Sequence, residues 1–158
     1  MILRNLKPSD DAALAALIRS NLKKYRLDIP GTAYFDAGLD HLSDFYLAEP
    51  ERRAYLILEE DGAPVGGVGL AEFPHIEDCA ELQKLYLADA FKGRGLGYRL
   101  IGAVEAAARA RGYRRMYLET HTNLEAAIHL YEKTGYAEID KPESVVHATM
   151  NRFYLKDL

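Results

Sequence analysis

The chain has 158 residues, of which 49% are hydrophobic and 28% charged. This length fits one domain with its own core, so we expect a single domain over residues 1–158, and the composition is that of a globular protein. The formal net charge of −4 disfavours a general nucleic-acid binder, because such proteins neutralise phosphates with basic side chains.

No apolar run approaches the roughly 20 residues of a membrane helix, and the N-terminus lacks the pattern of a secretion signal. We therefore expect no membrane partner and a cytoplasmic protein. The one cysteine, Cys79, has no partner for an internal disulfide and no Cys or His at metal-ligand spacing. It is interpreted as a buried small hydrophobic residue, and no metal is expected.

The first half of the chain begins with a predicted strand over residues 2–7 and a helix whose apolar positions recur every three or four residues. A second helix is predicted over residues 33–47, ended by Pro50. An antiparallel meander follows, with strands predicted over residues 53–59, 64–73 and 79–87.

The second half begins with a helix predicted over residues 96–111 and a strand over 114–120. Together with the strand 79–87 they make a βαβ crossover. A helix over 123–134 ends at Gly135. The remaining segments, 136–139 and 145–155, predict a final hairpin.

A glycine-rich turn, Lys92-Gly93-Arg94-Gly95-Leu96-Gly97, stands where a strand leads into a helix. Exposed N–H groups and the helix dipole favour an anion at such a place, and glycine lets the anion approach the backbone. The two basic side chains favour a diphosphate. The spacing does not match the G-x-x-x-x-G-K-[ST] phosphate loop or the G-x-G-x-x-G dinucleotide fingerprint.

These residues resemble the GNAT acetyltransferase superfamily. Lys92-x-x-Gly95-x-Gly97 resembles its R/Q-x-x-G-x-G/A signature, with Lys in place of Arg or Gln. The run ELQKLYL at 81–87 resembles the fourth strand of the family, and NLEAAIHLYEKTGY at 123–136 resembles its N-x-x-A-x-x-L-Y-x-x-x-G-F/Y block. The match is close over residues 56–136, and the order of elements agrees over the whole chain.

The resemblance implies an α/β (α+β) fold. Its central sheet is mixed but mostly antiparallel, with about seven strands flanked by four helices, and its fourth and fifth strands are splayed. It implies an N-acetyltransferase that moves an acetyl group from acetyl-CoA to a primary amine of a small molecule by direct attack. It places the cofactor-binding positions at Leu85, Tyr86, Leu87, Lys92, Gly93, Arg94, Gly95, Leu96, Gly97, Tyr98, Asn123 and Tyr131.

The chemistry requires a general base, because an alkylamine is protonated at neutral pH. Glu81 is the first candidate from the resemblance, and an even spacing would put its side chain on the same face as Leu87 if the strand contains no bulge. His121, at the end of the strand 114–120, is the second candidate, and water is the third. Tyr131 matches the tyrosine near the cofactor sulfur and is expected to be the general acid. His75, His129 and His147 are interpreted as structural.

The acceptor is expected between the first two helices and the final hairpin, where the sequence is least informative. Residues that could line its pocket or hold an ammonium group are Tyr25, Tyr34, Phe35, Tyr46, Phe73, Asp28, Asp36 and Glu72. A protein or peptide acceptor, a non-catalytic acyl-CoA sensor and a nucleotide-binding protein stay open as alternatives. Similar proteins commonly form homodimers, but the sequence locates no interface.

Overall fold

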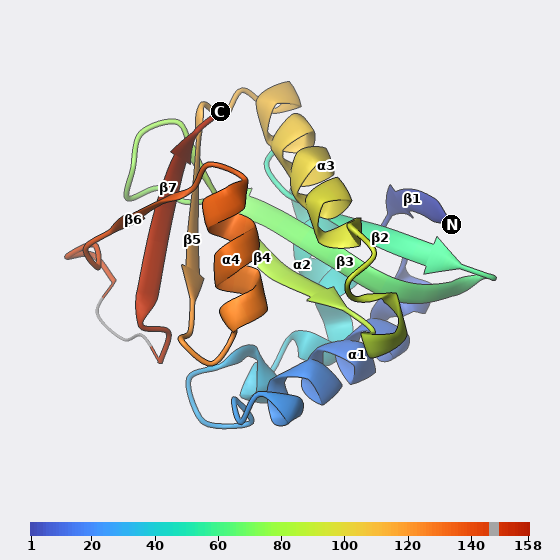
Figure 1. Ribbon diagram of the computed structural model, residues 1–158. Helices are drawn as coiled ribbons and strands as arrows, with labels where there is room; N and C mark the ends of the chain where they lie inside the picture. Colours follow the sequence, from blue (N-terminus) through green and yellow to red (C-terminus); the bar gives the residue numbers. More distant parts are fainter. Residues whose placement is uncertain (146–148) are drawn as a thin grey trace.

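A mixed seven-stranded sheet runs through the centre of the protein and carries helices on both faces (Figure 1). The computed structural model describes residues 1–145 and 149–158. The strand order is β1-β2-β3-β4-β5-β7-β6, and each neighbouring pair is antiparallel except β4 and β5. The strands are β1 (Ile2–Asn5), β2 (Ala54–Glu60), β3 (Ala63–Glu72), β4 (Cys79–Leu87), β5 (Arg115–Thr120), β6 (Ala137–Ile139) and β7 (Arg152–Asp157).

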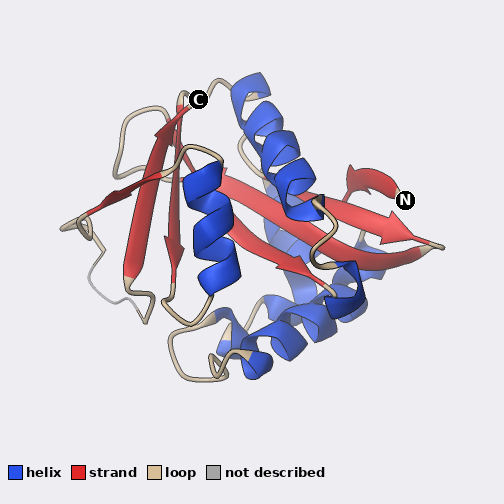
Figure 2. Ribbon diagram, in the orientation of Figure 1, coloured by secondary structure: helices blue, strands red, loops and turns tan. Residues whose placement is uncertain are grey.

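The α-helices divide between the two faces of the sheet, as Figure 2 shows by secondary structure. α1 and α2 pack on one face, and α3 and α4 pack on the other. None of the helices in the described part of the chain is long and apolar enough to cross a membrane. The helices are α1 (Asp11–Lys24), α2 (Leu42–Ala48), α3 (Leu96–Ala110) and α4 (Glu125–Lys133), with 3-10 turns η1 (Pro8–Asp10), η2 (Ala33–Phe35), η3 (Leu39–His41) and η4 (Asp89–Phe91).

Each face of the sheet has its own hydrophobic core. Because alternate residues of a strand point to opposite faces, β2 supplies both cores, with Leu58 on the α3 side and Ile57 on the α1 side. Val104 of α3 and Ile18 of α1 are likewise fully buried. Each of these side chains contributes roughly 1.5–3 kcal/mol by leaving water.

Two glycines of β3 leave room for buried tyrosines. A Cβ at Gly67 would lie 2.5 Å from Cε1 of Tyr55, and a Cβ at Gly69 would lie 2.6 Å from the hydroxyl oxygen of Tyr46. Both tyrosines are buried in the core on the α1 side. The rings therefore lie directly against the β3 backbone because these positions have no side chain.

The predicted fold class is confirmed, including the seven strands, the four α-helices and the parallel β4–β5 pair. The strand predicted at 79–87 has the observed bounds of β4. The continuous helix predicted over 33–47 is wrong, because the segment forms η2, η3 and only then α2. The backbone of Asp36 is extended (ψ 128°), which interrupts a helix. Two residues later, Gly38 would make a helix less stable by about 1 kcal/mol than alanine would. Leu39 and Leu42, whose spacing suggested one helix face, are buried from these shorter elements.

The final hairpin is confirmed in its pairing, since β6 and β7 are antiparallel neighbours. Its second strand begins at Arg152 rather than at residue 145. Val145 lies instead in a turn, where its N–H donates to the carbonyl of Pro142 at 2.9 Å. The predicted strand positions 146–148 lie outside the described residues.

Candidate active site

The sheet opens between β4 and β5. The two strands pair in parallel only where Cys79–Glu81 lie beside Arg115–Tyr117. Beyond this point β4 stays paired with β3 as far as Leu87, and β5 stays paired with β7 as far as Thr120. The two strands diverge, each held by its other neighbour (Figure 1). The predicted splay is confirmed.

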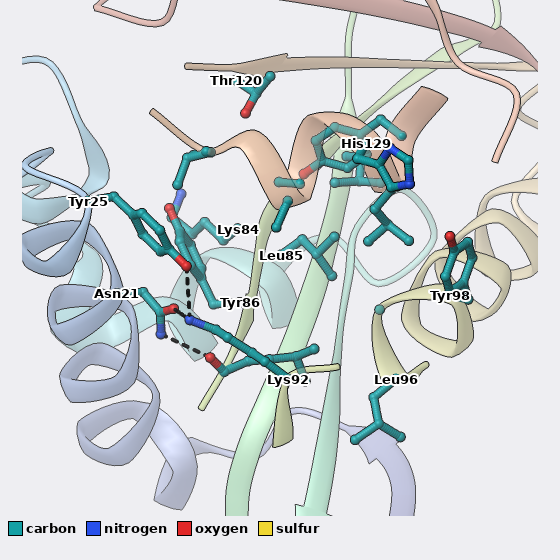
Figure 3. Close-up of a pocket in the computed structure, with 18 of the residues that line it drawn as sticks. Asn21, Tyr25, Lys84, Leu85, Tyr86, Lys92, Leu96, Tyr98, Thr120 and His129 are labelled. Carbon is teal, nitrogen blue, oxygen red and sulfur yellow. Dashed lines mark hydrogen bonds between the residues drawn. The ribbon is translucent and has the colours of Figure 1, made fainter. Parts of the chain in front are cut away.

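A cavity of about 320 Å³ lies in this opening. Figure 3 shows that its walls come from α1, β4, the glycine-rich turn and α4. The lining residues are Asn21, Tyr25, Leu82, Lys84, Leu85, Tyr86, Leu87, Lys92, Gly93, Gly95, Leu96, Gly97, Tyr98, Glu119, Thr120, Leu124, Ala126, Ala127, His129, Leu130, Tyr131 and Met150. Most of the predicted cofactor-binding positions therefore meet around one cavity; Arg94 and Asn123 are not among its lining residues.

The glycine-rich turn has a backbone shape that side chains disfavour. Gly93 and Gly95 have φ of +72° and +74°, and a Cβ at either would meet nothing within 4 Å. The space in front of the turn is therefore open. A Cβ at Gly97 would lie 2.7 Å from Cδ2 of Leu130, so the missing side chain there lets α4 pack against the start of α3.

The N-terminus of α3 presents donors without an opposing charge. Gly95 is the N-cap residue and has no side chain to accept a hydrogen bond, and the first turn contains no acidic residue. The N–H groups of Leu96, Gly97 and Tyr98 have no partner within the helix, as at any helix start. No backbone group of the described residues accepts from them either. The helix dipole adds positive potential at this end.

The Lys92 side chain turns away from this helix end and toward α1. Its ammonium donates to Oδ1 of Asn21 at 2.7 Å, to Oδ1 of Asp89 at 2.7 Å and to the hydroxyl oxygen of Tyr25 at 3.4 Å. The two ammonium groups of Lys24 and Lys92 lower the pKa of Asp89 to about 2. The charge of Lys92 is thus compensated locally, contrary to the interpretation that it adds positive charge for a diphosphate.

Strand β4 contains a β-bulge. Gly69 of β3 faces Gln83, but Gly67 faces Tyr86, so β4 has one more residue than β3 over this interval. The extra residue is Lys84, whose φ is +50°. Its carbonyl oxygen accepts a hydrogen bond of 2.7 Å from the buried hydroxyl of Tyr55.

The bulge overturns one expectation about the site. An extra residue reverses the alternation of side chains along a strand. Glu81 and Leu87 therefore point to opposite faces of the sheet, and the prediction that they share a face is wrong. Leu85 and Leu87 pack on the α3 side, whereas Tyr86 packs on the α1 side.

Glu81 is held by a chain of hydrogen bonds. The hydroxyl of Tyr46 donates to Oε1 of Gln83 at 2.8 Å, and Nε2 of Gln83 donates to Oε2 of Glu81 at 2.9 Å. Burial raises the pKa of Glu81, and the nearby carboxylate of Glu119 raises it further. Glu81 is not among the residues that line the cavity.

Glu119 does line the cavity, although no role was predicted for it from the sequence. The hydroxyl of Tyr117 donates to its Oε2 at 3.0 Å. Tyr117 pairs with Glu81 at the end of the parallel contact. Glu119 is two residues beyond Tyr117, so it lies on the same face of β5, where the strands part. The βαβ register could have indicated this position, because the one acidic residue of β5 falls where the strands part.

Tyr131 lies at the cavity wall on α4 and is 5% exposed. Its ring packs edge-on against Tyr136, with 5.9 Å between centroids. Burial raises the pKa of its phenol well above the usual value, with a smaller contribution from Tyr86. The phenol therefore holds its proton at neutral pH.

His121 and Asn123 shape the turn before α4. Nδ1 of His121 accepts from the backbone N–H of Asn123 at 3.1 Å, and the Asn123 side-chain amide donates to the carbonyl of Tyr25 at 3.0 Å. Neither residue lines the cavity. His129, interpreted as structural, does line it, and His147 lies outside the described residues.

The candidate acceptor residues separate in the structure. Tyr25 lines the cavity, whereas Tyr46 is buried in the core on the α1 side and Phe73 is buried in a separate small cluster with Tyr117 and Phe153. Nε of Arg53 donates to Glu72 Oε2 at 2.9 Å, so Glu72 is already paired. Asp36 lies 3.8 Å from the ammonium of Lys84.

Residues 18–136 match the family model described as the Acetyltransferase (GNAT) family. The chain is 38% identical over 141 residues to the uncharacterized N-acetyltransferase YjgM of Escherichia coli, covering 88% of this chain and 83% of that protein. A GNAT-family acetyltransferase from Staphylococcus aureus superposes with a TM-score of 0.86 at 19% identity, covering 99% and 98% of the two chains. The PaiA N-acetyltransferase from Thermoplasma acidophilum, solved with coenzyme A, superposes with a TM-score of 0.78 at 19% identity over 99% and 98%.

The splayed sheet, the glycine-rich turn and these matches define one class of protein. The chain belongs to the GNAT acetyltransferase family. It is an acyltransferase enzyme with the mixed α/β fold of that family.

Proposed function

We propose that this enzyme transfers an acetyl group from acetyl-CoA to a primary amine of a small molecule, by direct attack in a ternary complex. The observation that carries the proposal is the continuity of the cavity. It extends from the uncapped N–H groups of α3, through the gap between β4 and β5, to Tyr131 and Glu119.

The glycine-rich turn fits the pyrophosphate of the cofactor. Gly93 and Gly95 leave open space at the helix end, and the N–H groups of Leu96, Gly97 and Tyr98 supply donors. Arg94 is exposed beside the turn, with its guanidinium carbon 5.2 Å from the ring centroid of Phe91. We therefore assign the positive charge of the phosphate site to the helix end and Arg94.

The gap between β4 and β5 fits the pantetheine arm. In the described part of the chain, the edge of β4 beyond Glu81 has no strand partner on the β5 side. The carbonyls of Lys84 and Leu87 already accept from Tyr55 and Asn21, and the remaining backbone groups of this edge are available to an extended ligand. Leu85, Leu87 and Ala127 give this part of the cavity an apolar lining. An amide-bearing, mostly aliphatic chain matches both features.

Two residues at the cavity wall account for the protons. At pH 7 an alkylamine with a pKa near 10.4 is protonated, and holding it neutral costs about 4.6 kcal/mol. Glu119 takes the proton from the ammonium, and the free amine attacks the thioester carbonyl carbon. The carbon–sulfur bond then breaks, and Tyr131 gives its proton to the thiolate. As the amide forms, the nitrogen loses a second proton, which returns to the phenolate of Tyr131 through solvent, and Glu119 releases the first proton to solvent.

An acyl-enzyme on cysteine is disfavoured by the position of Cys79. Its side chain is buried, and burial raises the pKa of the thiol to about 11. The residue lies where β4 and β5 are still paired and does not line the cavity. Because only a thiolate is an effective nucleophile, direct transfer is the simpler reaction at this site.

The test combines acetyl-CoA calorimetry with a screen of small amines that measures free thiol. We expect binding of acetyl-CoA and release of thiol with at least one amine. Binding without thiol release from any amine would favour an acyl-CoA sensor, and no binding would refute the proposal.

A pair of isosteric variants then identifies the base. Glu119→Gln should lower kcat by about 10²- to 10⁴-fold, the usual contribution of a general base. Glu81→Gln should have a smaller effect, because Glu81 does not line the cavity. A larger fall in kcat for Glu81→Gln than for Glu119→Gln, with a shifted pH–rate profile, would identify Glu81 as the general base.

A further inference from the structure

We propose that the acceptor is an amine that also carries a carboxylate, and that the ammonium of Lys84 binds that carboxylate. This inference rests on the N-acetyltransferase activity proposed above and names the class of its acceptor. Lys84 lines the cavity from the bulge of β4 and is drawn among the lining side chains in Figure 3.

The backbone at Lys84 is unfavourable for a lysine. Its φ of +50° lies in the left-handed region, where glycine and asparagine are the common residues. The bulge is held by the hydroxyl of Tyr55 at the Lys84 carbonyl, a contact that a glycine at position 84 would make equally well. The fold therefore does not require the lysine side chain, and strained positions of this kind concentrate at functional sites.

The two lysines of the cavity differ in how they are paired. The ammonium of Lys92 donates to three oxygens, two of them at 2.7 Å. Among the described residues, the ammonium of Lys84 makes no hydrogen bond, and its ion pair with Asp36 is long, at 3.8 Å. Asp36 is on the exposed connection between η2 and η3, with 53% of its side chain exposed.

A long pair with an exposed carboxylate is a weak competitor for a ligand. Charge-assisted hydrogen bonds between an ammonium and a carboxylate are about 2.7–2.9 Å long. An acceptor carboxylate inside the cavity can reach that distance, whereas Asp36 does not in this structure. The ligand would replace Asp36 as the partner of Lys84.

The cavity thus offers one charge of each sign from its two diverging strands. Lys84 is on β4, and Glu119 is on β5. An amine that bears a carboxylate complements both, with its ammonium toward Glu119 and its carboxylate toward Lys84. Complementary charges fix the orientation of a ligand, so the pair would direct the amine toward the reacting end of the cofactor.

The experiment compares amino acids with their own carboxamides as acceptors, with acetyl-CoA and a free-thiol readout. Loss of one charge-assisted hydrogen bond corresponds to about 10- to 100-fold in kcat/KM. The unmodified enzyme should prefer each acid over its amide by that factor. Lys84→Met should bring the ratio close to one, while the matched surface control Lys23→Met should keep it.

Two further variants separate recognition from folding. Lys84→Gly suits the positive φ, so it should unfold at or above the midpoint of the unmodified protein and still lose the preference for acids. Asp36→Asn removes the competing carboxylate and should raise kcat/KM for acids relative to amides.

Three results would overturn the inference. Equal use of acids and amides by the unmodified enzyme would refute it while leaving the acetyltransferase activity intact. An equal loss with both acceptor classes in Lys84→Met and Lys84→Gly would assign Lys84 a role other than carboxylate recognition. Failure to bind acetyl-CoA at all would instead refute the proposed function, and this inference with it.

Discussion

Replacing Tyr131 with phenylalanine isolates the proton that the proposed reaction delivers to sulfur. The ring stays in place against Tyr136, and only the hydroxyl at the cavity wall is lost. A general acid contributes about 10²- to 10⁴-fold, or about 2.7–5.4 kcal/mol of barrier. The hydroxyl has no hydrogen-bond partner among the described residues, so its removal should change the free energy of unfolding by less than about 1 kcal/mol.

The assay measures kcat by thiol release and the dissociation constant of acetyl-CoA by calorimetry. We expect kcat to fall by at least 100-fold at a cofactor affinity within about threefold of the unmodified enzyme. Tyr136→Phe is the matched control, because it removes the same group from a neighbouring buried ring that does not line the cavity. Unchanged kcat in Tyr131→Phe, or an equal fall in the control, would remove Tyr131 from the role of general acid.

Three other predictions concern the phosphate site, the bulge and the response to pH. Gly95→Ala should raise the KM for acetyl-CoA and cost about 1–2 kcal/mol of stability, because φ is +74° there; an unchanged KM would count against a phosphate site at this turn. Tyr55→Phe should lower the free energy of unfolding in urea by about 1–3 kcal/mol, since it leaves the Lys84 carbonyl without its partner. Arg53 lowers the pKa of Glu72 from 4.5 to about 2, so the pair stabilises the fold above pH 4.5 and loses this effect as the pH falls toward 2. The difference in melting temperature between the unmodified protein and Glu72→Gln should shrink over that range, and a constant difference would contradict the linkage.

Most elements could be predicted from the sequence because their apolar period is strong and their ends carry turn residues. β4 and α3 were placed within a residue of their observed bounds. The segment 33–47 failed for a local reason, since apolar residues at helical spacing also fit a series of 3-10 turns that bury Leu39 and Leu42. Burial alone does not distinguish the two arrangements, and the chain leaves the helical region at Asp36.

The site was predictable to the level of the cavity but not of individual contacts. The family pattern located the glycine-rich turn and Tyr131, and both border the cavity. It could not show that Lys92 donates to Asn21 and Tyr25, because those contacts depend on where α1 lies relative to the turn. The bulge at Lys84 also left no sequence signal, since the positive φ falls on a residue that rarely adopts it.

The glycines at positions 67 and 69 of β3 let a substitution outside the cavity affect β4. A methyl group at Gly67 would push the Tyr55 ring off the strand and withdraw the phenol that braces the Lys84 carbonyl. A methyl group at Gly69 would do the same to Tyr46, and through it to the amide that orients Glu81. Changes in a strand that does not line the cavity would thus reach β4, through displacement of the Tyr55 and Tyr46 rings.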